Sequence, residues 1–222
     1  MYALLRKAKL VEPGATEEAA RPVRTAIVPM LRAQRGFRLH LGFVSEACET
    51  VGVTFFDDRP AAMEIYERVR TWVAENMRDL SPEQPEVRFG DVLLQRGAAQ
   101  GLGSADMALF VTIRQYEGVG PFEEVVPLLS EHTLPVMERH PGFRTFYAFR
   151  DEHDPHHVVS VSLWRDRGAA LAAHQRVLEA MEALRDVFPT RPTITVGAAR
   201  IITTAPSVRD DARRGADQQC SG

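Results

Sequence analysis

The second half of the chain carries the clearest pattern of apolar and polar positions. Two β-rich runs, residues 143–150 and 158–164, are joined by a polar loop, which predicts a hairpin of two strands. Over residues 168–188, apolar side chains recur every three or four positions, which predicts an amphipathic helix. Apolar runs at 108–115 and 193–201 predict a strand at each end of this half.

A further helix is predicted between the first strand and the hairpin. Residues 122–139 have helical spacing, and Pro127 and Pro135 should kink or split the helix. The predicted order is therefore strand, helix, strand, strand, helix, strand.

The first half repeats this plan. Residues 29–43 (PMLRAQRGFRLHLGF) align with 135–149 (PVMERHPGFRTFYAF) at an offset of 106, with Gly-Phe-Arg in register. At that offset Met1 aligns with Met107, and related segments follow in the same order at offsets of 108 and 107. The first helix of this half, around residues 17–34, is the weakest match. The chain is therefore predicted to be an internal duplication.

Each copy predicts a ferredoxin-like βαββαβ unit of the α+β class, whose helices cover one face of an antiparallel sheet. The other face is apolar, with alternating sets over residues 37–43 and 143–149, and each Å² of apolar surface buried contributes about 25 cal/mol. Two such sheets can cover each other, which predicts a barrel-like pseudo-dimer. The predicted segments are a first repeat (1–94), a linker (95–106), a second repeat (107–204) and a disordered tail (205–222).

Composition narrows the classes of partner. The 222 residues are 45% hydrophobic and carry a net charge of −3, so nothing favours nucleic acid as a partner. No apolar run is long enough for a membrane span, and no secretory signal is visible. With two cysteines, the expected location is a reducing cytoplasm. An exposed strand edge would allow a homodimer.

The helix at 168–188 carries the most informative polar residue. His174 lies between Leu171 and Leu178 on the predicted apolar face, so it should point toward the sheet. Trp164 ends the strand before this helix, and the Trp-x9-His spacing can bring indole and imidazole to one cavity. The corresponding residues of the first repeat are Phe56 and Tyr66. The alternative is a structural histidine bonded within the core.

The second repeat resembles the antibiotic-biosynthesis monooxygenase (ABM) type of dimeric α+β barrel. The matching text is HTLP at 132–135, PGF at 141–143, VSVSLW at 159–164 and AALAAH at 169–174. The resemblance implies a fused dimer. It also implies a cofactor-independent monooxygenase of a small aromatic or polyketide-like molecule in secondary metabolism, or a haem-degrading protein with His174 as iron ligand. The Asn of the haem-degrading branch is missing from the first strand.

An oxygenase of this type needs a polar group that deprotonates a phenol or stabilises the phenolate. The predicted site comprises three catalytic candidates, His174, Trp164 and Arg114, and five substrate-binding candidates, which are Tyr147, Tyr116, His132, Tyr66 and Phe56. No metal is expected, because the ligand-rich loop at 151–157 is read as a solvated hairpin. The expected ligand is small and hydrophobic or aromatic. A non-catalytic small-molecule-binding barrel is the alternative from another class.

Overall fold

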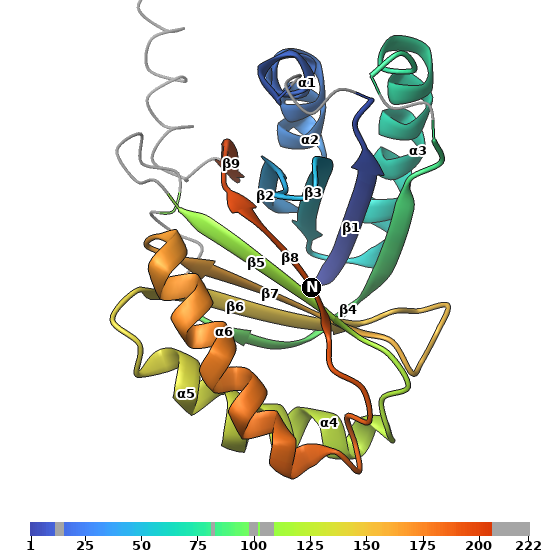
Figure 1. The fold of residues 1–222 in the computed structure, drawn as a ribbon. Coiled ribbons are helices and arrows are strands. Elements are labelled where there is room, and N and C mark those ends of the chain that lie inside the picture. Colours follow the sequence, from blue (N-terminus) through green and yellow to red (C-terminus); the bar gives the residue numbers. More distant parts are fainter. Residues whose placement is uncertain (12–15, 81–82, 98–101, 103–108, 206–222) are drawn as a thin grey trace, which may run out of the picture.

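The chain folds as two copies of the same unit (Figure 1). The structure is a computed structural model that describes residues 1–11, 16–80, 83–97, 102 and 109–205. The first repeat comprises β1 (Tyr2–Lys9), α1 (Thr16–Pro22), the π-helical turn η1 (Val23–Ile27), α2 (Val28–Ala33), β2 (Phe37–Val44), β3 (Glu49–Phe56), α3 (Arg59–Asn76) and β4 (Glu86–Arg96). The predicted order of elements is confirmed.

The second repeat follows the same order. It comprises β5 (Phe110–Tyr116), α4 (Phe122–Leu128), the π-helical turn η2 (Leu129–Thr133), α5 (Leu134–Glu138), β6 (Phe143–Arg150), β7 (Val158–Trp164), α6 (Arg167–Met181), the 3-10 turn η3 (Glu182–Leu184), β8 (Thr193–Ala198) and β9 (Ile201–Thr204). The helix predicted at 122–139 is split, and both repeats have a π-helical turn at the same place.

The strands form one antiparallel sheet in the order β8-β5-β7-β6-β4-β1-β3-β2-β9. The first part of β4 pairs with β1, whereas residues 92–96 cross over and pair with β6. In the same way β8 pairs with β5, and β9 pairs with β2. The strand predicted at 193–201 is therefore two segments that change partner near Arg200. Because β8 and β9 are consecutive, they join the two ends of the sheet into a barrel.

The barrel interior is an apolar core shared by the two repeats, and the helices lie on the outside (Figure 1). Leu39, Leu41 and Phe43 point inward, whereas Phe37 packs under the helices. A register shift between Phe37 and Leu39 separates the two faces, and another follows Phe143. The alternating sets predicted from the sequence therefore do not lie on a single face.

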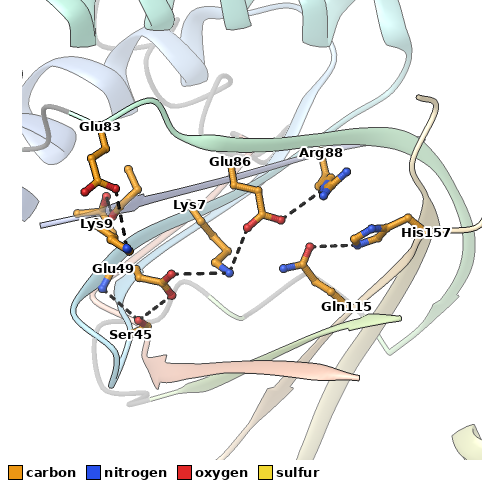
Figure 2. Close-up of polar contacts among 11 residues, drawn as sticks. Lys7, Lys9, Ser45, Glu49, Glu83, Glu86, Arg88, Gln115 and His157 are labelled. Atoms are coloured by element: carbon orange, nitrogen blue, oxygen red, sulfur yellow. Dashed lines mark hydrogen bonds and ion pairs between the residues drawn. The ribbon is translucent and has the colours of Figure 1, made fainter. Parts of the chain in front are cut away.

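A polar network ends this interior (Figure 2). Lys7 Nζ lies 3.8 Å from a Glu49 oxygen and 3.3 Å from a Glu86 oxygen. Nearby, His157 Nε2–H donates to Gln115 Oε1 at 3.2 Å. Gln115 and His157 occupy in the second repeat the positions of Lys7 and Glu49 in the first, so the two halves close the barrel with equivalent pairs.

Strand pairing corrects the alignment of the first strands. Tyr2 pairs with Phe56, and Phe110 pairs with Trp164, so the offset is 108 rather than the 106 inferred from Met1 and Met107. Met107 itself lies outside the described residues. With this offset Arg114 corresponds to Arg6.

The loop after β6 corrects a second expectation. Asp151, predicted to be solvated, is 3% exposed and accepts a hydrogen bond from Arg88 at 2.9 Å. Glu152 binds both Arg59 and Tyr2 of the first repeat, at 2.8 and 2.9 Å for the two Arg59 nitrogens. This loop therefore joins the repeats. In the described part of the chain, no group of three or more His, Cys, Asp or Glu side chains is arranged to hold a metal ion.

Helix α6 is rotated relative to the prediction. Its buried stripe includes Ala169, Ala173 and Val177, whereas Leu171 and Leu178 are only partly buried. The small residues Ala169 and Gly142 allow α6 to pack closely against the turn before β6, since a Cβ added at Gly142 would lie 2.4 Å from Ala169 Cβ.

The rest of the predicted organisation is tested only in part. The predicted linker begins inside β4, and most of it, like the predicted tail, falls on residues outside those described. Among the described helices, none has the length and apolar character of a membrane span.

Candidate functional site

The first repeat contains a cavity of about 700 Å³ between the outer face of its sheet and its helices. Apolar side chains from β1, η1 and α3 form much of the wall, including Leu4, Ile27, Ile65 and Val69. A largely apolar hollow of this size with a few polar groups is the usual form of a small-molecule site.

His40 on β2 lies at the floor of this cavity. Its side chain is buried, with 5% exposure, and its Nδ1 lies 2.8 Å from Thr54 Oγ1. The second ring nitrogen, Nε2, is buried and has no hydrogen-bond partner. Burial lowers the pKa of His40 to about 4, so the imidazole is neutral at pH 7. Nε2 is therefore the ring atom left to bond a ligand.

Arg6 on β1 is one of four arginines that line the cavity, with Arg70, Arg78 and Arg200, and two glutamates, Glu75 and Glu83, line it as well. Among the described residues, no carboxylate lies within ion-pair distance of the Arg6 guanidinium. Burial lowers the pKa of Arg6, and the nearby Tyr66 on α3 opposes that shift. Arg6 and Tyr66 both line the cavity. A cation without a carboxylate partner is suited to an anionic oxygen of a ligand.

Small side chains make room for this cavity. Two positions that line it hold smaller residues than their counterparts in the second repeat: Gly42 against Ala148 and Gly52 against Ser160. A Cβ at Gly42 would come within 3.4 Å of His40 Nε2, and one at Gly52 within 3.4 Å of Cε1. The position of His40 is taken by Phe146, which is buried in the second core.

The three catalytic candidates from the sequence meet in the second repeat. Arg114 Nε–H donates to His174 Nδ1 at 3.1 Å, and its Nη1 donates to Ser162 Oγ at 3.1 Å. Trp164 Nε1–H donates to the same Ser162 oxygen at 3.0 Å. Arg114 and Trp164 are 0% exposed. Burial, and then the charge of Arg114, lower the pKa of His174 to about 4. Arg114, Ser162 and Trp164 are packed within the core, whereas His174 is partly exposed.

The geometry at His174 does not fit an axial haem ligand. Because Arg114 donates to Nδ1, the proton of the neutral imidazole is on Nε2, and neither nitrogen offers a free lone pair to iron. The adjacent guanidinium also repels a metal cation.

The five substrate-binding candidates lie in different places. Tyr116 is buried under the helices of the second repeat, Tyr147 points into the barrel against Phe55, and His132 is exposed on η2. Phe56 packs in the first core, and Tyr66 lines the 700 Å³ cavity. A smaller hollow of about 230 Å³ in the second repeat is lined by residues 178–192 and by none of the eight candidates.

Arg6, His40 and Thr54 are polar cavity residues that the sequence-based set did not include. The aligned segments show His40 opposite Phe146, and glycines of the first repeat opposite larger residues of the second. The smaller side-chain volume in the first repeat was the feature of the sequence that could have located the cavity there.

The sheets of the two repeats join at their edges, and helices cover the outer face of each. This arrangement is the dimeric type of α+β barrel, here formed within one chain. Residues 120–186 match the model of the family described as "Antibiotic biosynthesis monooxygenase". The family match lies within the second repeat, and the fold of the whole chain is a tandem α+β barrel. No match is found among the curated protein sequences.

Solved structures share this architecture. A candidate monooxygenase from Fusobacterium nucleatum subsp. nucleatum ATCC 25586 has a TM-score of 0.72 and 10% identity, over 93% of this chain and 95% of that one. An anthrone oxidase-like protein has a TM-score of 0.67 and 12% identity, over 93% and 94%. A candidate monooxygenase from Lactobacillus acidophilus NCFM has 0.67 and 11%, over 93% and 97%. These likenesses establish that the tandem barrel occurs within single chains.

Proposed function

We propose that the chain is a cofactor-independent, oxygen-using monooxygenase of a small aromatic or polyketide-like molecule, and that the first-repeat cavity is its site. The observation that carries this proposal is a buried imidazole nitrogen without a partner on the floor of a 700 Å³ apolar cavity that also contains Arg6. The family match and the names of the structural neighbours, two candidate monooxygenases and an anthrone oxidase-like protein, support the reaction type.

His40 is the proton acceptor in this proposal. When Nδ1–H donates to Thr54 Oγ1, Nε2 carries the lone pair that can take a proton from a phenol or from an activated CH2 group. The pKa of His40 is low in the empty cavity because of burial alone. A bound anion raises it, because a negative charge nearby favours the imidazolium.

Arg6 stabilises the anion that results. A delocalised oxyanion beside the guanidinium is electron-rich enough to transfer an electron to O2, and the two radicals then combine at carbon. For an anthrone-type substrate, the balance is one CH2 group and one O2 giving one carbonyl and one water. The CH2 carbon is oxidised and O2 is reduced, so no further oxidant or reductant is needed.

Oxygen uptake with anthrone, measured without added flavin and in the presence of EDTA, tests the proposal. We expect uptake by the wild-type chain and loss in His40→Phe, which installs the residue found at position 146. His174→Phe is the comparison variant, because the sequence alone favours the second repeat. Loss of uptake in His174→Phe with retention in His40→Phe would overturn the placement of the site.

The same experiment distinguishes a monooxygenase from a barrel that binds its ligand without catalysis. A thermal shift with anthrone and no uptake, over a panel of phenols, would contradict the monooxygenase and leave a binding protein. In that case His40→Phe should still abolish the thermal shift.

A further inference from the structure

The core of the second repeat contains a guanidinium whose charge is not neutralised. Arg114 is 0% exposed, and its Nη2 has no hydrogen-bond partner. Its other contacts are neutral groups, the imidazole of His174 and the hydroxyl of Ser162. Within the described part of the chain, no carboxylate lies within ion-pair distance of it. A buried charge without a counter-charge is strongly unfavourable.

The two groups that Arg114 already bonds have no further acceptor to offer Nη2. Ser162 Oγ accepts from Arg114 and from Trp164, and its own hydroxyl donates to the Thr112 carbonyl at 3.4 Å, so its bonding capacity is used. With Nδ1 occupied by Arg114, His174 retains an N–H on Nε2. Among the described residues, no acceptor is hydrogen-bonded to Arg114 Nη2.

Three buried hydroxyls of this repeat are also without hydrogen-bond partners, and one of them, Ser160, pairs with Arg114 across the sheet. Thr112 lies two residues before Arg114 on the same face of β5, and its Oγ1 has no hydrogen bond. Thr133 on η2 is 1% exposed, and its Oγ1 is likewise unpartnered. Its counterpart in the first repeat, Ile27, lines the 700 Å³ cavity, so Thr133 occupies the corresponding place above the second sheet.

We propose that the second repeat binds one small monovalent inorganic anion, such as chloride, between Arg114 Nη2 and the hydroxyls of Thr112 and Thr133. One negative charge neutralises the guanidinium, and a spherical acceptor takes hydrogen bonds from all three donors. Large anions are excluded, because Trp164 and Phe146 fill the surrounding core. The site is independent of the oxygenase proposal, which places its chemistry in the first repeat.

Thermal unfolding of the full chain in sodium chloride, against sodium gluconate at equal ionic strength, tests the proposal. A ligand that binds only the folded chain at about 100 times its Kd should raise Tm by about 5–10 °C for a chain of this size. We expect this rise in the wild type and in Arg6→Met, and its loss in Arg114→Met. Arg114→Met removes the buried charge and keeps much of the apolar stem, so it should fold.

A second measurement distinguishes an anion bound at Arg114 from one bound at Arg6. Crystals grown in sodium bromide should show anomalous scattering beside Arg114 Nη2. Equal Tm values in chloride and gluconate would show that the donors are satisfied by water and would overturn the proposal. A chloride response lost in Arg6→Met and retained in Arg114→Met would overturn it too, because the anion would then bind in the first-repeat cavity.

Discussion

Replacing the polar pair on the cavity floor should stabilise the ligand-free protein. His40 and Thr54 bond each other, and His40 Nε2 has no partner. Removing both members of a hydrogen bond with groups of similar shape is close to neutral, whereas an unsatisfied buried polar atom costs about 1–3 kcal/mol. The double variant His40→Phe, Thr54→Val should therefore gain about 1–2 kcal/mol, which corresponds to a rise in Tm of about 2–8 °C.

Urea denaturation and calorimetry without ligand measure this gain, and oxygen uptake by the same variant should be lost. Phe146→His is the matched control, since it places an imidazole in the packed core of the second repeat. It should cost about 2–4 kcal/mol, because a buried phenyl ring is replaced by a smaller polar one. If the double variant is instead destabilised by more than about 1 kcal/mol, Nε2 is already satisfied in the folded protein, and the reasoning for His40 as the free base fails.

Three further predictions follow from the described contacts. Between pH 6.5 and 4 the unfolded chain protonates His40 and His174 while the folded chain does not, so stability should fall on acidification. His40 should contribute up to about 3 kcal/mol of this fall, and urea titrations should show a smaller fall in His40→Phe. Glu152→Gln weakens the partly exposed bidentate pair with Arg59 and should lower the stability measured by denaturation slightly, with no loss arguing against that contact. Val177→Ala should cost about 2 kcal/mol and Leu178→Ala less than half of that; the reverse ranking would show that the helix is rotated.

Much of the fold could be predicted because the duplication supplied two readings of each element. Pro127 and Pro135 predicted the split helix, and the Gly-Phe-Arg triplets located the turn into β2 and β6. The register shifts after Phe37 and Phe143 could not be predicted, because a bulge changes the exposed face without changing the period of the pattern. The partner change near Arg200 depends on barrel closure, which is a non-local property.

The candidate site was harder to predict, because the reactive side chains and the small side chains that leave a cavity lie in different repeats. The sequence favoured His174 and Trp164 on the basis of side-chain chemistry, and the structure does bring them together with Arg114. A cavity, however, forms where side chains are small, and its location follows from Gly42 and Gly52 rather than from any reactive group. Comparing residue volumes between the repeats finds this difference, whereas comparing residue chemistry does not.

Covalent joining of the two repeats has a consequence for how such a barrel can evolve. In a symmetric dimer of identical chains, any substitution appears twice, so an open hollow and the stability it sacrifices would be present in both halves. Here His40 and Phe146 occupy equivalent positions with opposite characters. One half can keep an open interior while the other remains densely packed and supports it, a division of labour that is closed to a homodimer.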